Sequence, residues 1–174
     1  MDSIKIAGAL LILLAAAGIG NESAGGVRRR LEALYQCRSL TLLLQGQLKY
    51  AFSGLSEMLV EAGGRLEFPF SDFCRRLAEK LESMPGQEIG RLWRDTAEET
   101  LTGSGLTGKD RERFCELGNA LGYLDGESQC RRLESCGERI DREIARAEAE
   151  TAAKCRLYRS LGVLGGMFVT ILFL

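Results

Sequence analysis

Two apolar runs flank a long amphipathic middle in the pattern of hydrophobic and polar positions along this chain. The first run, residues 4–19, contains a single charged residue, and the second, residues 161–174, contains none. As helices they are about 24 Å and 21 Å long, against roughly 30 Å for the hydrocarbon core of a bilayer. Counting from Leu157 lengthens the second run to about 27 Å. We therefore predict transmembrane segments at residues 1–22 and 157–174.

Basic residues flank both runs on the side that faces the middle of the chain. They are Arg28, Arg29 and Arg30 after the first run, and Lys154, Arg156 and Arg159 around the start of the second. Because Lys and Arg beside membrane segments favour the cytoplasmic side, this pattern predicts a cytoplasmic domain at residues 24–156, held in the cell membrane by two spans. An alternative stays open for the first run. Ala15–Ala17 resembles a signal-peptide cleavage site, so this segment is either retained or cleaved.

The middle of the chain is helical throughout, because its apolar residues recur every three or four positions. In the first helix these positions include Leu31, Leu34, Leu42 and Leu48. Ser53 is the predicted N-cap of the second helix. Trp93 has helical spacing with Ile89, which favours a role as a core anchor over a ligand platform. The predicted helices cover about residues 27–50, 54–62, 68–83, 87–101 and 110–123, so the fold class is an all-α helical bundle.

The last helix begins at Gly126 and has no breaker before Leu157, so we expect it to run unbroken into the membrane. Its seam for packing against other helices is formed by Leu133, Gly137, Ile140, Ile144, Ala147, Thr151, Lys154 and Tyr158. Ion pairs four residues apart are predicted to support its exposed face: Glu138 with Arg142, Arg139 with Glu143, and Glu150 with Lys154. The candidate positions for packing against another membrane helix are Gly162, Gly165 and Gly166. The alternative that these glycines are only tolerated there stays open.

The loop GSGLTGKD at Gly103–Asp110 is where the sequence most resembles enzyme chemistry. It matches the Gly-x-x-x-x-Gly-Lys start of a phosphate-binding loop, but Asp110 replaces the Ser or Thr that binds magnesium, and no strand precedes it. The pattern Thr107-x-x-Asp110 instead predicts a capping box that begins a helix. No nucleophile with an attendant base stands out elsewhere, and the chain has no histidine. We therefore predict no catalytic residue, cofactor or metal.

Composition argues against one class of partner and leaves a second function open. Lys and Arg total 23 and Asp and Glu total 24, so the net charge of −1 gives no sign of a nucleic acid backbone as partner, and only readout by a few arginines stays open. The six cysteines form no Cys-x-x-Cys pair, which favours small core residues in a reducing compartment over a disulfide framework. The alternative function is a membrane-anchored regulatory or redox-sensing protein of another system, with Cys130 and Cys136 as its redox pair. Their spacing on one helix makes a direct bridge difficult.

Three stretches of the sequence resemble the stage III sporulation protein AB family of endospore-forming bacteria. They are RLYRSLGVLGGMFVTILFL at the C-terminus, LGNALGYLDGESQ at residues 117–129 and, more faintly, LLLQGQLKYAFSGLSEML at residues 42–59. Together with the chain length and the two terminal apolar runs, the likeness covers most of the chain. Two positions depart from the family pattern: Gln47 replaces an expected glutamate, and FSGL at residues 52–55 replaces a more usual Thr-Pro-Leu.

That resemblance implies a membrane component of the channel complex that joins mother cell and forespore during engulfment. Family members resemble the inner-membrane platform protein of type II secretion systems, whose helical cytoplasmic domain meets an assembly ATPase. The implied role is a non-enzymatic adaptor in the mother-cell membrane. Its partners are membrane lipid, other channel-complex proteins and a cytoplasmic secretion-type ATPase, and the chain itself binds no ATP. The candidate positions for the turn that aims the final helix are then Gly118, Leu121, Gly122 and Asp125.

Overall fold

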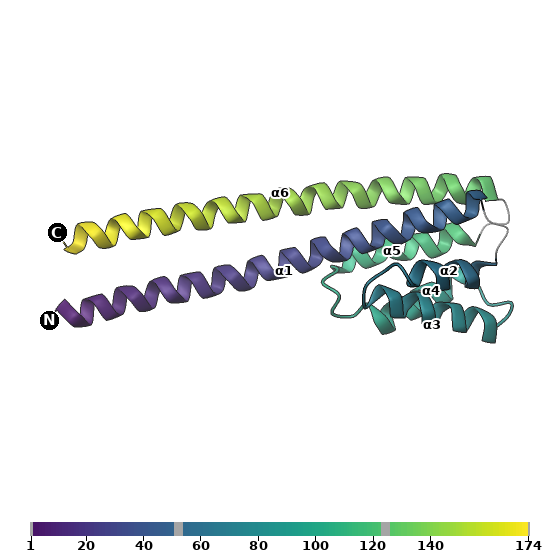
Figure 1. Cartoon of the computed structure of the whole chain (residues 1–174), viewed down its shortest axis with the longest axis horizontal. Helices are drawn as coiled ribbons and strands as arrows, with labels where there is room; N and C mark the ends of the chain where they lie inside the picture. The colour runs from purple at the N-terminus through teal and green to yellow at the C-terminus, as the bar shows by residue number, and fades with distance from the viewer. Residues whose placement is uncertain (1, 51–53, 123–125, 174) are drawn as a thin grey trace. The chain divides into compact units, whose positions relative to one another are not determined.

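The computed structural model of the chain consists of α-helices joined by short loops (Figure 1). It describes the backbone at residues 2–50, 54–122 and 126–173, and the side chains at residues 25–49, 54–122 and 126–153. Within these residues lie six helices: α1 (Asp2–Tyr50), α2 (Leu55–Gly63), α3 (Phe70–Ser83), α4 (Ile89–Thr100), α5 (Gly108–Leu121) and α6 (Gly126–Phe173). The prediction of an all-α bundle is confirmed, and the predicted limits of the short helices agree closely with the observed ones.

The chain divides into two compact units, residues 29–145 and residues 1–28 together with 146–174. Both α1 and α6 contribute to the two units without a break. The expectation that the last helix is continuous is confirmed. The first helix begins at Asp2, much earlier than the predicted start near Val27, so one helix covers what the sequence divides into an apolar segment and a domain. The proposed domain boundaries stay a prediction.

The two predicted membrane segments belong to the terminal unit. The backbone is helical at residues 2–22 and 157–173, but the side chains of residues 2–24 and 154–173 lie outside the described set. Among the side chains that the structure does describe, no helix combines the length and the apolar character needed to cross a bilayer. The candidate packing positions Gly162, Gly165 and Gly166 also lie outside these described side chains.

An aromatic cluster between α3, α4 and α5 forms the core of the unit made by residues 29–145. Phe70, Phe73, Trp93 and Phe114 are at most 1% exposed. The Phe73 ring meets Trp93 edge-on with 5.0 Å between ring centroids, and it meets Phe114 at 5.1 Å. Such edge contacts add to the gain from burying the rings. The prediction that Trp93 is a core anchor is confirmed.

The first helix buries one face within this unit. The residues on that face are Leu34, Cys37, Leu40, Thr41 and Leu44, each at most 2% exposed. Leu34 agrees with the predicted pattern, but the prediction for Leu42 is wrong, because its side chain is 51% exposed. Leu40 occupies the buried face, and a residue two positions further along a helix points to nearly the opposite side.

Caps and turns determine where the short helices begin and end. The N-cap of α2 is Gly54 and not the predicted Ser53, which itself lies outside the described residues. Gly86 and Gly103 have φ values of 91° and 87°, in the left-handed region that favours glycine. They lie in the turns that follow α3 and α4, so these turns require glycine because its backbone adopts positive φ values without strain.

Candidate functional site

The four positions predicted to form the turn before α6 do not share one role. Gly118 and Leu121 lie inside α5, Gly122 is its C-cap, and Asp125 lies outside the described residues. The Leu121 carbonyl accepts a hydrogen bond from the Gln129 side chain at 3.0 Å, which ties the end of α5 to the start of α6. Leu121 and Gly122 therefore lie where the two helices are connected, whereas Gly118 does not.

Gly118 is a packing position, because Trp93 of α4 lies directly against its backbone. A methyl group at Gly118 would overlap Cβ and Cγ of the Trp93 side chain. At Gly122 a methyl group would meet only the Asn119 carbonyl oxygen, at an ordinary 3.6 Å. The two glycines lie close together in the sequence, but only Gly118 is required for α5 to pack on α4.

The loop that resembles a phosphate-binding site begins α5. The Thr107 hydroxyl accepts a hydrogen bond from the Asp110 backbone N–H at 3.2 Å, and the Asp110 carboxylate accepts one from the Thr107 backbone N–H at 3.0 Å. This reciprocal pair confirms the predicted capping box. Gly105 of the same loop has a φ of 95°, and a side chain there would press on the backbone of Arg29 and Arg30 in α1.

Asp110 also belongs to a buried ionic junction that the sequence pattern does not reveal. We use this name for Arg30 of α1, Asp110 and Arg113 of α5, and Glu143 of α6. Arg30 binds both Asp110 oxygens, at 2.7 Å from Nε and 3.0 Å from Nη2, and donates to Glu143 at 3.3 Å. Arg113 lies 2.9 Å from the other Glu143 oxygen. The Asp110 side chain is 0% exposed and that of Glu143 is 9% exposed, so the junction joins three helices inside the unit.

The surroundings of Asp110 keep its carboxyl group ionised. Burial alone would raise the pKa of Asp110, but hydrogen bonds from Arg30 and Thr107 outweigh burial and hold this pKa below its ordinary value. The positive end of the α5 dipole therefore already has an anion beside it, which opposes the binding of a phosphate there.

One predicted ion pair of α6 is wrong because one of its two members is buried. Glu143 does not lie on the exposed face with Arg139; it is 7% exposed and belongs to the buried junction. Arg139 instead binds Glu116 of α5 at 2.9 Å. Contacts between helices therefore decide where these two charged side chains lie, in preference to pairing along α6.

Among the side chains that the structure describes, the cysteines do not form the geometry of a redox pair. Cys37, Cys74 and Cys115 are buried free thiols, as predicted for core residues. Burial raises the pKa of Cys74 to about 12, so little of its reactive thiolate form exists at neutral pH. Cys130 and Cys136 are partly exposed free thiols of α6. Six residues of an α-helix rise about 9 Å, beyond the Cα separation of about 7 Å that a disulfide can span.

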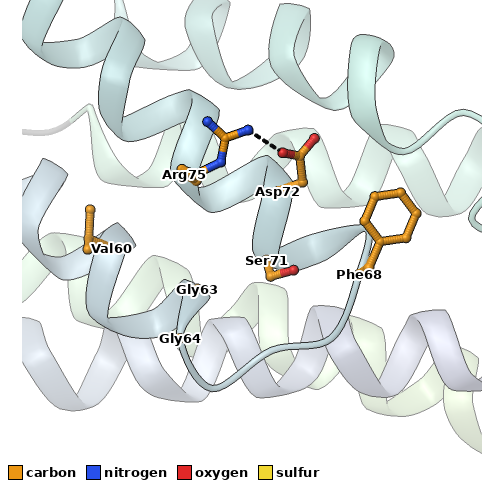
Figure 2. Close-up of a pocket in the computed structure, with 7 residues that line it drawn as sticks. All are labelled: Val60, Gly63, Gly64, Phe68, Ser71, Asp72 and Arg75. Atoms are coloured by element: carbon orange, nitrogen blue, oxygen red, sulfur yellow. Dashed lines mark hydrogen bonds and ion pairs between the residues drawn. The ribbon is translucent and has the colours of Figure 1, made fainter.

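An open groove lies between α2 and α3, and we call it the α2/α3 groove. Seven residues at the end of α2, before α3 and on α3 line it: Val60, Gly63, Gly64, Phe68, Ser71, Asp72 and Arg75. Figure 2 shows Val60 and Phe68 on opposite sides of it, with Asp72 and Arg75 of α3 joined along a third side. Val60 is 58% exposed and Phe68 is 81% exposed. Apolar side chains gathered at such exposure are typical of a surface that contacts another protein.

Helical spacing does not identify this groove, because it assigns apolar residues to the core. Phe70, Phe73 and Leu77 follow the helical spacing of α3 and are buried. Phe68 precedes them and falls outside that spacing. The signal in the sequence is therefore an aromatic residue for which the predicted helix has no buried position.

Comparison with known proteins connects nearly the whole chain to one family. A model of the family described as stage III sporulation protein AB matches residues 5–174. The chain is 22% identical over 172 residues to the stage III sporulation protein AB of Bacillus subtilis (strain 168), covering 98% of this chain and 99% of that protein. It also resembles a solved structure of stage III sporulation protein AB (SpoIIIAB), with a TM-score of 0.64 and 19% identity. That match covers 71% of this chain and 97% of the solved one, and it shows a shared fold.

Proposed function

The chain belongs to the stage III sporulation protein AB family, and from this premise we propose that it is a non-enzymatic membrane component of the channel complex between mother cell and forespore. In this role it is an adaptor like the platform protein of secretion systems. It contacts other channel-complex proteins and lipid in the membrane, and a cytoplasmic secretion-type ATPase outside it. The chain has two membrane spans, its helical domain faces the mother-cell cytoplasm, and it binds no ATP or nucleic acid itself.

The continuity of α1 and α6 is the observation that carries this proposal. Each helix runs without a break between the helical domain and one apolar end of the chain. Because each helix continues from one unit into the other, a contact made on the domain acts on the same helix that continues into an apolar end. An adaptor between a membrane channel and a cytoplasmic motor needs a connection of this kind.

The buried ionic junction supports the same role. Residues 29–145 form what we call the helical unit, and Arg30 and Glu143 lie near its two ends. At this level α1 and α6 are tied to each other through Arg30 and Glu143, and α1 is tied to α5 through Asp110. Because these charges are buried and paired, separating the helices there is unfavourable. A force on the domain would thus be shared by both long helices.

Cross-linking in membranes tests the contact with the ATPase. The full chain and a cytoplasmic secretion-type ATPase are co-expressed, a lysine-reactive cross-linker is added, and the products are identified by mass spectrometry. We expect the ATPase to be linked to lysines of the helical domain, such as Lys49, Lys80 and Lys109. Linkage no more frequent than that to an unrelated cytoplasmic ATPase would contradict the adaptor role.

Nucleotide binding tests the non-enzymatic part of the proposal. The full chain should have no measurable affinity for ATP, and Lys109→Ala should make no difference, because the loop around it forms a helix cap. An affinity for ATP that disappears in Lys109→Ala would identify this loop as a nucleotide site and overturn the proposal.

An impermeant thiol reagent added to intact cells tests the topology. Cys130 and Cys136 are partly exposed in the folded domain, so burial does not protect them from the reagent. They should stay unlabelled in intact cells and become labelled after lysis. Labelling from outside would place the domain on the other side of the membrane.

The membrane part of the proposal assigns Gly162, Gly165 and Gly166 to packing against another helix. Gly166→Ile should reduce assembly of the complex in membranes while insertion is retained, because a bulky side chain separates the backbones without lowering hydrophobicity. Val163→Ile is the control for bulk alone. Equal assembly of the wild type and both variants would mean that the glycines are only tolerated.

A further inference from the structure

The α2/α3 groove combines an apolar projection and an open space on one face of the helical unit. Phe68 projects at one side and is 81% exposed, and Val60 forms the other side. The open volume is about 460 Å³, which is sufficient for a phenyl ring. A side chain added at Gly64 would meet only backbone of its own helix, so the space above the end of α2 is free. One surface thus carries both an aromatic ring and the room to receive one.

The charged residues beside the groove are paired with one another. Asp72 accepts hydrogen bonds from Arg75 at 2.5 Å and from Arg76 at 2.8 Å. On the α2 side, Arg65 donates to Glu61 at 3.0 Å. The rim therefore presents both signs side by side, and a strongly acidic or strongly basic partner gains little from it. A second copy of this surface carries the same balance of signs, so two copies can approach each other without an excess of like charge.

We propose that the α2/α3 groove is a contact between two copies of this chain. In a two-fold arrangement, Phe68 of each copy enters the groove of the other between Val60 and Gly64, so every contact is made twice. Removing two exposed aromatic rings from water is the main gain. The groove offers far fewer residues than the roughly 20–30 a side of a standard interface, so the contact is weak and reversible. The proposal does not depend on the adaptor role.

Sedimentation equilibrium of the full chain in density-matched detergent tests this contact. The wild type should show a monomer–dimer equilibrium that depends on protein concentration. Phe68→Ala should raise the dissociation constant about tenfold or more, because each dimer then buries two fewer rings. Gly64→Leu should have a similar effect by filling the groove from within. The φ of −66° at Gly64 is accessible to any residue, so this variant keeps the fold.

Leu42→Ala is the matched control, because Leu42 is 51% exposed on α1 and does not line the groove. It should leave the dissociation constant unchanged, and Trp93 fluorescence should confirm that all variants are folded. The proposal is overturned if the wild type is monomeric at every concentration, or if Phe68→Ala associates as well as Leu42→Ala. A monomeric chain whose Phe68→Ala variant loses ATPase cross-links would also overturn it, while supporting the adaptor role.

Discussion

Two sets of charged residues in the helical unit have similar contact distances, but one joins three helices and the other lies within a single helix. The buried ionic junction links three helices through residues up to 113 positions apart. The second set, which we call the α3 cluster, lies along one helix and consists of Asp72, Arg75, Arg76 and Glu79. The contact between Arg30 and Asp110 measures 2.7 Å, and that between Arg76 and Asp72 measures 2.8 Å.

Burial separates the two sets where distance does not. The Asp110 side chain is 0% exposed, whereas that of Asp72 is 21% exposed and its arginine partners are more exposed still. Water and salt screen exposed pairs, so they contribute little to stability. In a buried set, removing one charge leaves the opposite charge poorly solvated, which is costly. Burial and the number of helices joined therefore decide what an ion pair contributes to stability here.

Asp110→Ala should have the largest effect of the changes that test this comparison. It removes the carboxylate that binds Arg30 through two bonds, and it also removes half of the capping box. We expect the free energy of unfolding to fall by about 3–5 kcal/mol. Urea unfolding of the full chain, followed by the fluorescence of Trp93, the one tryptophan in the sequence, measures this. A loss below about 1 kcal/mol, typical of exposed pairs, would mean that burial does not separate the two sets.

Gly118→Ala tests whether a close contact between helices is as important for stability when no charge is involved. The new methyl group would overlap the Trp93 side chain, and overpacking of this kind costs about 1–3 kcal/mol. Gly122→Ala is the matched control, since its φ of −77° suits any residue and its nearest neighbour is 3.6 Å away. Equal unfolding free energies for the two variants would mean that Gly118 is not a packing position.

Thr107→Ala should have an intermediate effect on stability, because Thr107 is close in sequence to its partner Asp110, which is buried. Loss of an N-cap side chain costs about 0.5–2 kcal/mol. The same urea unfolding measures it, and Thr107→Ser, which keeps the hydroxyl group, should restore most of the loss. If the serine variant is as unstable as the alanine variant, the hydroxyl contact to the Asp110 backbone is not what stabilises this helix end.

The sequence alone predicted the features whose interacting residues lie close together in the chain. The capping box could be predicted because Thr107 and Asp110 are one helical turn apart, and the spacing of Ile89 and Trp93 indicated a buried face in the same way. Most limits of the short helices followed from similar local signals. Such features depend on neighbours that the sequence itself places next to each other.

The features that depend on packing between helices could not be predicted from local sequence signals. Arg30 and Asp110 are 80 positions apart, and spacing along α6 paired Glu143 with Arg139 because nothing in the sequence showed which face is buried. Gly118 and Gly122 look equivalent in the sequence, although only Gly118 meets Trp93. The contribution of each residue was set by helices far away in the chain.

Asp72→Asn should have the smallest effect at neutral pH, because Arg75 and Arg76 remain in contact with water when their partner loses its charge. Acid titration then distinguishes the two sets by the pH dependence of stability. The hydrogen bond from Arg75 lowers the pKa of Asp72, and hydrogen bonds from Arg30 and Thr107 lower that of Asp110 against the effect of burial. A carboxyl group with a lowered folded pKa stabilises the fold above its unfolded pKa of about 3.9, and this contribution is lost as the pH falls through the folded value.

The wild type should therefore lose stability below about pH 4. The two asparagine variants should differ in how much their unfolding free energy falls over the same pH range. Asp110→Asn has already lost the charged contact, so its unfolding free energy should change less with acid than that of the wild type. Asp72→Asn should follow the wild-type curve, because solvent screens the pairs of the α3 cluster at every pH. Urea unfolding between pH 7 and about pH 3 measures both curves. If Asp72→Asn instead removes the larger part of the acid sensitivity, the exposed cluster contributes more than the junction, and burial is not the property that separates the two sets.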